Sequence, residues 1–496
     1  MQVGPGAARY STLSCSTPKP CVTSRWLRPL PTSSRASNRL RSSCIAGRVA
    51  PDDSAHLALC PRLIPYRFSE WHAVQIEAAK HCWHGAEATG TLSVNQKGSE
   101  DAREFFLLKN LLTCKEAESI ADQSREFGIE YDPEPDSVDG CPAFHSLIVQ
   151  HGQILNPALA SLLKPILQTR ILPYVKARFA SPTITLCDAF IRRYQQHERL
   201  TISNHFDALA FATVVVDLNP QDHTGGLYVQ AGAGAESRRF CEVTPGDAVV
   251  HQFDLQHGVH VYEGHRQSLV LWFCDSEQSC AEGSARWLLP ASEGGNTDAQ
   301  FNLAGLYDHG SGGFPQDLDE AIRWYQRSAE AGNPFSQNRL GTLHELGRGV
   351  EQDPCRAVHF WRLAAEQGNP QAQFALGEAW WACYGVHEQN QGLAIELFAA
   401  AAQQGHAGAQ HALGEAYLEG AERLPSSQVH AEECFLAAAQ QQHADAQFSL
   451  ALCLRARAAI AGNADDANLD ETAQQWLKRA AAQGHGGAIA ALKQRQ

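Results

Sequence analysis

The chain has 496 residues, which is long for one ordinary domain, so we expect two or three domains, each with its own core. A net charge of −14 argues against a nucleic-acid-binding protein, which would present a basic face. The 15 cysteines contain no Cys-x-x-Cys pair, and no run of about 18 apolar residues marks a membrane span. We therefore expect a soluble protein of a reducing compartment, without a nucleic-acid or membrane partner.

The N-terminal segment differs in composition from the rest of the chain. Residues 1–50 are rich in Ser, Arg and Pro and contain no Asp or Glu, as is typical of an organelle transit peptide. A disordered tail or a mistaken gene start would have the same composition. The prediction is thus a plastid or mitochondrial location, with a cytoplasmic one as the alternative. We expect residues 51–103 to be a linker of unclear structure.

Two patterns follow in chain order. In residues 104–182 apolar residues lie three and four apart, in EFFLLKNLL, KEAESIADQSREFG and ALASLLKPILQTRILPYVKARF, which predicts helices. Residues 183–275 contain short β-branched and aromatic runs broken by Gly, Pro and Asp. These runs, TITLCDAFIRRY, FATVVVDL, GGLYVQ, DAVVHQF and QSLVLWF, predict the strands of a compact antiparallel barrel or sandwich.

The last part of the chain repeats itself. After a linker at 276–295, five similar segments in residues 296–493 align on glutamines spaced 36 or 37 residues apart: Gln300, Gln337, Gln373, Gln410 and Gln447. Each is followed by a second helical pattern, which predicts a solenoid of stacked helical hairpins. These second helices should end in a left-handed residue, at Gly332, Gly368, Gly405 and Gly484, and Gln442 breaks this rule once. The longer spacing before Gly484 indicates an insertion around AGNADDANLD.

The repeat region resembles the Sel1-like subfamily of tetratricopeptide-type repeats. The resemblance implies a scaffold that binds a protein partner or a protein substrate. A solenoid that only stabilises its neighbour or mediates self-association is the alternative.

His205 and Asp207 form a His-x-Asp triplet in HFDALAFATVVVDLN. The triplet alone has little meaning, and a second copy, His443-Ala444-Asp445, lies in a predicted helix, where residues two apart face opposite sides. In a strand, His205 and Asp207 would project from the same face. Further on, His257 opens a predicted strand, a turn is expected at 262–264, and Arg266 enters the next strand, with Ser268 at strand spacing.

In this order the residues resemble the 2-oxoglutarate and Fe(II)-dependent dioxygenase domain of the prolyl 4-hydroxylase type. The resemblance implies a multidomain α and β protein in which residues 183–275 form a double-stranded β-helix (jelly roll), supported by helices of residues 104–182. It implies His205, Asp207 and His257 as iron ligands that leave three positions open. Arg266 would hold the far carboxylate of 2-oxoglutarate, since a guanidinium offers two parallel donors. The cofactors implied are Fe(II), 2-oxoglutarate and O2, with L-ascorbate as an optional reductant.

Other residues near the motif are weaker candidates. Tyr194 falls where the family often has a tyrosine in the co-substrate pocket, and Ser268 is expected to point into the barrel beside Arg266. Three histidines compete with His257 as a ligand, and we interpret them as surface or hydrogen-bonded residues: His251, His260 and His265. His223 is expected in a loop without a role.

One departure concerns the substrate. Leu227 and Tyr228 follow the paired glycines, where many prolyl hydroxylases of this type have an acidic residue and a threonine. A collagen-like substrate is therefore in doubt, whereas the iron chemistry is not affected.

The expected activity is the oxidative decarboxylation of 2-oxoglutarate to succinate, coupled to hydroxylation of a C–H bond in a protein or peptide side chain. One alternative is a non-catalytic scaffold that acts through its repeats, although such a relic should have lost a ligand or the arginine. A third alternative is a cupin-like binding or isomerase module. Arg266 argues against it, because such a module needs no carboxylate clamp.

Overall fold

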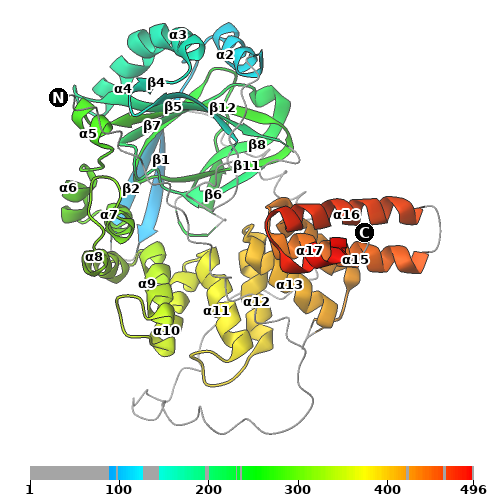
Figure 1. Cartoon of the computed structure of the whole chain (residues 1–496). Helices are drawn as coiled ribbons and strands as arrows, with labels where there is room; N and C mark the ends of the chain where they lie inside the picture. The colour runs from blue at the N-terminus through cyan, green and yellow to red at the C-terminus, as the bar shows by residue number, and fades with distance from the viewer. Residues whose placement is uncertain are drawn as a thin grey trace, which may run out of the picture. The chain divides into compact units, whose positions relative to one another are not determined.

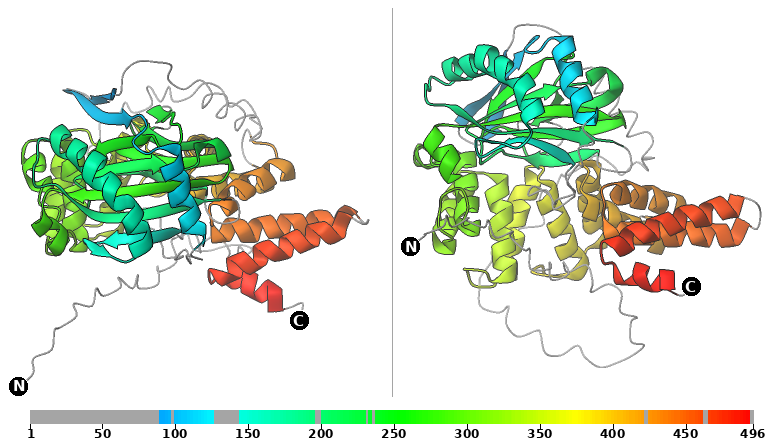
Figure 2. Two further views of the ribbon diagram at one scale, coloured as in Figure 1. Left: turned by 90° about the horizontal axis from the view of Figure 1, so that it is seen from above. Right: turned by 45° about the horizontal axis from the view of Figure 1, so that its top comes forward.

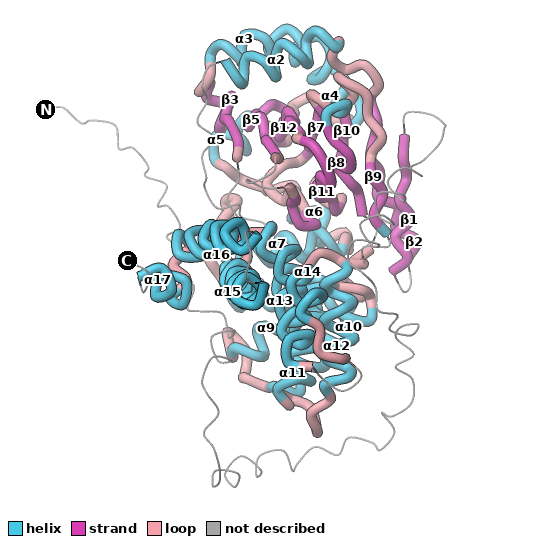
Figure 3. Tube along the Cα trace, turned by 90° about the vertical axis from the view of Figure 1, so that its right-hand side faces the viewer, coloured by secondary structure: helices cyan, strands magenta, loops and turns pink. Residues whose placement is uncertain are grey.

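The computed structural model describes residues 89–96, 99–126, 144–195, 200–230, 232–234, 237–420, 424–461 and 465–493. The transit-peptide-like segment 1–50 lies outside the described residues, as does most of segment 51–103. The chain divides into the units Met1–Leu59 and Cys60–Gln496, and every element described below belongs to the second. In that unit a region rich in antiparallel strands precedes a region of helices (Figures 1 and 3).

Two antiparallel sheets form the first region. Their order is β1-β2-β10-β7-β12-β5-β3-β4 in the larger sheet and β6-β11-β8-β9 in the smaller one. The strands are β1 (Thr89–Gln96), β2 (Ser99–Leu108), β3 (His145–Gln150), β4 (Gln153–Ile154), β5 (Thr185–Tyr194), β6 (Thr201–His205), β7 (Ala212–Asp217), β8 (His223–Gln230), β9 (Arg238–Phe240), β10 (Ala248–Gln252), β11 (Gln256–Gly264) and β12 (Arg266–Cys274). The five predicted runs are confirmed as β5, β7, β8, β10 and β12.

The larger sheet separates two cores. Helices α2 (Cys114–Glu126), α3 (Pro157–Ile166) and α4 (Leu172–Arg178) cover its outer face, with a π-helical turn, η2 (Leu167–Ile171), between the last two. Side chains alternate along a strand, so in β7 Val214 and Val216 pack under these helices, whereas Val215 faces the smaller sheet. Polar residues at the inner positions of β7, β10 and β12 consequently lie between the two sheets.

A predicted helix and a predicted turn in this region were wrong. The run EFFLLKNLL, predicted as a helix, lies largely in β2, where Phe106 contacts the outer core and Phe105 the inner one. Because both faces of this strand are apolar, its sequence lacks the alternation that marks a strand. The turn expected at 262–264 lies later, since β11 continues to Gly264 and the chain reverses at His265. Helices over KEAESIADQSREFG and ALASLLKPILQTRILPYVKARF are confirmed.

The second region is a solenoid of helical hairpins (Figure 2). Its helices are α7 (Thr297–His309), α8 (Leu318–Glu330), α9 (Pro334–Leu346), α10 (Pro354–Glu366), α11 (Pro370–Ala382), α12 (Gln391–Gln403), α13 (Ala407–Glu419), α14 (Gln428–Gln440), α15 (Ala444–Ala461), α16 (Asp465–Ala482) and α17 (Gly486–Lys493). The segment expected as a linker contains α5 (Glu277–Glu282) and α6 (Leu288–Glu293). Cys280 and Leu288 of these helices share one core with Cys187 of β5 and Leu303 of α7.

The helix ends follow the repeat pattern. The four glycines expected to be left-handed have φ between 83° and 99°, and Gln442 adopts a φ of 65° in the same position. Helices α15 and α16 are 18 residues long, against 13 in each earlier pair, which locates the expected insertion. Among the described residues, no helix is both long and apolar enough to cross a membrane.

Candidate metal centre

Three metal-ligand side chains meet at one end of the smaller sheet. His205 ends β6 and lies directly opposite His257 of β11 in the strand register, and Asp207 follows two residues after His205. The Nε2 atoms of His205 and His257 lie 3.7 and 3.4 Å from oxygens of the Asp207 carboxylate. One ligand atom from each of the three residues lies within 4.8 Å of the others. Two segments about fifty residues apart in the sequence thus converge on one point.

The surroundings hold Asp207 and His257 in the protonation states that bind a metal. Burial opposes ionisation of Asp207, but the neighbouring histidines and the Thr213 hydroxyl, which donates to Oδ2 at 2.7 Å, lower its pKa to about 2. Burial also lowers the pKa of His257 to about 4. Nδ1 of His257 lies 3.2 Å from the Leu255 carbonyl, which can only accept, so this nitrogen carries the proton and Nε2 presents its lone pair.

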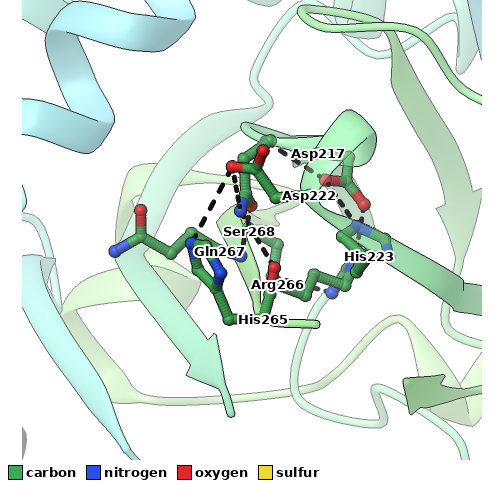
Figure 4. A network of polar contacts seen from close by, with 8 residues as sticks. Asp217, Asp222, His223, His265, Arg266, Gln267 and Ser268 are labelled. Carbon is green, nitrogen blue, oxygen red and sulfur yellow. Dashed lines mark hydrogen bonds and ion pairs between the residues drawn. The ribbon is translucent and has the colours of Figure 1, made fainter. Parts of the chain in front are cut away.

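A second polar cluster lies between the sheets, around Arg266 (Figure 4). Arg266 is 1% exposed, and its Nε donates to Oδ2 of Asp217 at 2.7 Å. One terminal nitrogen, Nη1, donates to the Ser268 hydroxyl at 3.1 Å, and the guanidinium lies 5.6 Å from the centre of the Tyr194 ring. The structure therefore brings Arg266, Ser268 and Tyr194 together on the inner face of the larger sheet.

His223 belongs to this second cluster, and its expected place in a loop was wrong. It opens β8, its side chain is only 3% exposed, and its Nε2 lies 3.3 Å from Oδ1 of Asp217. The paired glycines let this part of β8 pass close to its neighbours. A Cβ on Gly225 would lie 2.2 Å from the His260 carbonyl oxygen, and one on Gly226 would lie 3.2 Å from the His223 ring.

The three competing histidines have different surroundings. The His265 side chain is 44% exposed, and His260 stacks on Tyr262. His251 is fully buried, and its Nε2 lies 3.9 Å from Oδ2 of Asp207. Sequence reasoning missed Thr213 and Asp217 as well, although both are polar residues four apart, at inner positions of a valine strand.

Another group of close metal-ligand side chains consists of the cysteines Cys187, Cys274 and Cys280. All three are buried in the apolar core that joins the sheets to α7, and the Sγ atoms of Cys187 and Cys280 lie 2.7 Å apart. The hydrogen bond to Cys274 and burial raise the pKa of Cys187, and burial with the Cys187 thiol raises that of Cys280 to about 12. Protonated thiols in an apolar core are typical of structural cysteines.

Comparison with known proteins identifies the helical region. Five consecutive units match the model of the Sel1 repeat: residues 297–333, 334–369, 370–406, 407–443 and 444–485. The C-terminal region is therefore a Sel1-repeat solenoid, a type of structure that generally mediates protein–protein interaction. A search of curated proteins found no match.

Two kinds of solved structure are among those similar to this chain. A Sel1 repeat protein from Oxalobacter formigenes is 32% identical, with a TM-score of 0.37, over 42% of this chain and 58% of that one. A 2OG-Fe(II) oxygenase-family oxidoreductase from Burkholderia pseudomallei is 16% identical, with a TM-score of 0.29, over 44% of this chain and 95% of that one. A Pseudomonas putida prolyl-4-hydroxylase is 18% identical, with a TM-score of 0.26, over 34% and 91%. With TM-scores below 0.5, these likenesses carry no functional argument for this chain.

Proposed function

We propose that the protein is an Fe(II)- and 2-oxoglutarate-dependent dioxygenase that hydroxylates a side chain of a protein or peptide, similar to the prolyl hydroxylases. Residues 183–275 form its catalytic core, a double-stranded β-helix supported by residues 104–182, and 296–493 form the interaction solenoid. The observation that carries the proposal is the convergence of His205, Asp207 and His257 on one point, with a buried arginine between the same sheets.

The three side chains fit Fe(II) chemically. Two neutral imidazoles and one ionised carboxylate are the donor set of non-haem Fe(II) oxygenases. The Leu255 carbonyl orients His257, and the Thr213 hydroxyl orients Asp207, as outer groups do at metal sites. When bound, Fe(II) with O2 supplies the oxidative decarboxylation of 2-oxoglutarate to succinate, coupled to C–H hydroxylation, with L-ascorbate as an optional reductant.

Arg266 is the proposed carboxylate clamp. A guanidinium has five N–H donors, of which Asp217 and Ser268 each accept one, so among the described residues three donors are left for a bound carboxylate. The bond from Nε to Asp217 fixes the plane of the guanidinium, so the clamp is oriented before the co-substrate binds. In this proposal Ser268 and Tyr194 line the same pocket.

Contacts next to the site favour a protein substrate. Phe206, between His205 and Asp207 in the sequence, packs its ring against Phe301 of α7 and Phe335 of α9, with centroids 6.2 and 5.8 Å apart. The Arg238 guanidinium, just beyond the β8–β9 connection, also donates to the Gln404 carbonyl of the solenoid at 3.2 Å. A polypeptide held by the Sel1 repeats would therefore lie near the metal centre.

Anaerobic loading with Fe(II), followed by turnover of 2-oxoglutarate with a panel of peptides, tests this proposal. We expect succinate formation that requires Fe(II) and rises when the correct peptide is present. Wild-type protein that neither binds 2-oxoglutarate nor releases succinate with Fe(II) would exclude the dioxygenase function. The Sel1-repeat match of residues 297–485 would then favour the second candidate, a non-catalytic scaffold.

A further inference from the structure

A buried imidazole shares its partner with the proposed clamp. Oδ2 of Asp217 accepts from Nε of Arg266 at 2.7 Å, and Oδ1 of the same carboxylate lies 3.3 Å from Nε2 of His223 (Figure 4). Because an ionised carboxylate can only accept, Nε2 of His223 carries a proton. The other ring nitrogen, Nδ1, is buried and has no hydrogen-bond partner among the described residues. Asp217 thus holds one nitrogen of the ring, and the other is left for a bound group.

Nδ1 of His223 and the guanidinium of Arg266 border the same place, beside Gly226. A Cβ on Gly226 would lie 3.8 Å from Nδ1 of His223 and 3.7 Å from Nε of Arg266. The φ of Gly226 is 123°, a conformation that residues with a side chain rarely adopt. A small group at this place would consequently touch the imidazole and the guanidinium together. Buried polar atoms nearly always have a partner, so the unpaired Nδ1 points to a bound group that provides one.

The buried charges decide which kind of group fits. The side chains of Asp217 and Arg266 are both buried, and their opposite charges cancel. A ligand carboxylate beside Arg266 adds a second negative charge, which is costly in a buried site unless a second cation balances it. A doubly protonated His223 is that cation, since it donates from Nε2 to Asp217 and from Nδ1 to the ligand. Two cations then face two carboxylates, and the site is neutral.

Charged groups on the neighbouring segments reach the solvent. Asp222 and His265 lie 3.8 Å apart with partly exposed side chains, and Glu263 of β11 is exposed. Water and salt screen charges at exposed positions. The protonation of His223 should therefore depend chiefly on the buried ion pair and on the group that binds beside it.

We propose that His223 is a second donor to the far carboxylate of 2-oxoglutarate, so that an imidazolium on β8 and the guanidinium on β12 hold this group together. The inference rests on the proposed function and deepens it. Asp217 is the common counter-charge of the two cations and orients both of them. Because Nδ1 donates only when the ring is doubly protonated, the affinity for 2-oxoglutarate should fall as the pH rises.

Two substitutions separate contact with the co-substrate from support of Asp217. His223→Gln places its amide nitrogen near the position of Nε2, so it can still donate to Asp217, but it leaves no polar atom at the position of Nδ1. His223→Asn does the reverse, because its amide nitrogen lies near the position of Nδ1. Isothermal titration calorimetry measures the binding of 2-oxoglutarate to the full chain, loaded anaerobically with Fe(II).

We expect His223→Gln to weaken this binding about ten-fold or more, as for the loss of a hydrogen bond between charged groups, and His223→Asn to weaken it less. Thermal unfolding without the co-substrate checks that both variants are folded. Stronger weakening in His223→Asn would mean that His223 acts only by supporting Asp217. That result, or wild-type affinity in His223→Gln, would overturn the inference.

The pH dependence of binding provides a second measurement. Between about pH 6 and about pH 8.5 the affinity of the wild-type protein for 2-oxoglutarate should fall, and His223→Gln should remove most of this fall. His265→Gln changes the partly exposed histidine of the same cluster, and this control should behave like the wild type. An equal pH dependence in wild-type and His223→Gln protein would contradict the inference.

The second donor and the dioxygenase can fail separately. If the wild-type protein binds 2-oxoglutarate without forming succinate, and His223→Gln weakens this binding, the carboxylate site is retained and the dioxygenase is rejected. If the wild-type protein forms succinate and His223→Gln changes neither the affinity nor the KM for 2-oxoglutarate, the dioxygenase is retained and the role of His223 is rejected.

Discussion

Buried and half-buried carboxylates have opposite surroundings in the two regions of the molecule. In the strand-rich region, burial opposes ionisation of Asp207, Asp217 and Asp247, but other interactions outweigh burial and lower the pKa of each carboxylate. The main partners are histidines for Asp207, Arg266 for Asp217 and Lys109 for Asp247. In the solenoid, burial together with the neighbouring Glu345 carboxylate raises the pKa of Glu378 to about 7. Burial similarly raises the pKa of Glu415 to about 7, with a contribution from Glu419.

The difference separates the candidate site from the repeat solenoid. A carboxylate held ionised by cations or hydrogen-bond donors is ready to bind a metal or orient an arginine. A carboxylate shielded from water without a cation costs stability, which a repeat array tolerates because its stability is spread over many similar interfaces. The first repeat has a compensated carboxylate as well, since Asp308 pairs with Arg339 and Arg348.

Removing the carboxylate at the centre of the site should have the largest effect. Asp207→Ala deletes the charged member of the donor set, and we expect it to abolish Fe(II)-dependent succinate formation. The matched control is Asp445→Ala, in the second His-x-Asp triplet, where the aspartate faces His485 at 3.2 Å and is 39% exposed. This control should keep wild-type turnover. Normal succinate formation in Asp207→Ala would instead reject Asp207 as a ligand.

The sequence predicted the solenoid better than the sheets, because contacts in the solenoid join residues close in sequence and contacts in the sheets join distant ones. Each repeat packs on the next one along the chain, so spacing and helix-ending glycines suffice to predict hairpins. The structure adds that Gln442, which breaks the glycine rule, is left-handed as well. The larger sheet pairs β2 with β10, about 140 residues away, and no local pattern specifies that pairing. The run at Phe105 and Phe106 was predicted as a helix because both faces of β2 are apolar there, so the sequence lacks the alternation that marks a strand.

At the candidate site, a motif order was enough to select His205, Asp207, His257 and Arg266, which the structure brings together in two clusters. Their roles as ligands and clamp remain predictions. Their hydrogen-bond partners Thr213 and Asp217 were missed because they come from β7 and share no motif with them. The available signal was a polar residue at an inner position of a valine-rich strand.

Breaking the buried pair beneath the proposed clamp should have the next largest effect. Asp217→Asn leaves the buried Arg266 charge without its counter-charge, which should cost about 3 kcal/mol of stability. It should also raise the 2-oxoglutarate KM more than it lowers kcat, because the guanidinium loses its orientation. Chemical denaturation and co-substrate titration measure the two effects. Asp122→Asn, whose pair with Arg125 is exposed, is the control and should change stability by less than about 1 kcal/mol.

The solenoid carboxylates should respond to pH in the opposite direction from those of the sheets. The pKa of Glu378 rises from an ordinary 4.5 to about 7 on folding, so the unfolded chain loses this proton first. The contribution of Glu378 to the stability of the fold is therefore complete below about pH 4.5, and it is lost as the pH rises toward 7. Glu378→Gln removes this loss, and we expect it to stabilise α11 at pH 7.5 by on the order of 1 kcal/mol.

Hydrogen exchange of the α11 amides at pH 5 and pH 7.5 measures this effect, because it reports local opening in a chain of several cooperative units. Glu366→Gln, on the exposed end of α10, controls for the removal of one negative charge. Equal protection of wild-type and Glu378→Gln protein at pH 7.5 would show that the solenoid tolerates this carboxylate without cost. The contrast between the two regions would then disappear.

The smallest expected effect tests whether the solenoid tolerates local strain in the same way. Gln442 has a φ of 65°, a conformation that costs a residue with a side chain about 1 kcal/mol, whereas Gly405 occupies the equivalent place in the preceding repeat. Gln442→Gly relieves this cost but adds freedom to the unfolded chain, so we expect a net gain of about 0.5 kcal/mol. The reverse change, Gly405→Gln, should cost a similar amount, because a Cβ there would meet no atom within 4 Å and only backbone conformation changes. Thermal unfolding of both variants measures these effects. The side chain of Gln447 donates a hydrogen bond to that of Gln442 at 3.2 Å. Destabilisation by Gln442→Gly would mean that this hydrogen bond outweighs the backbone strain.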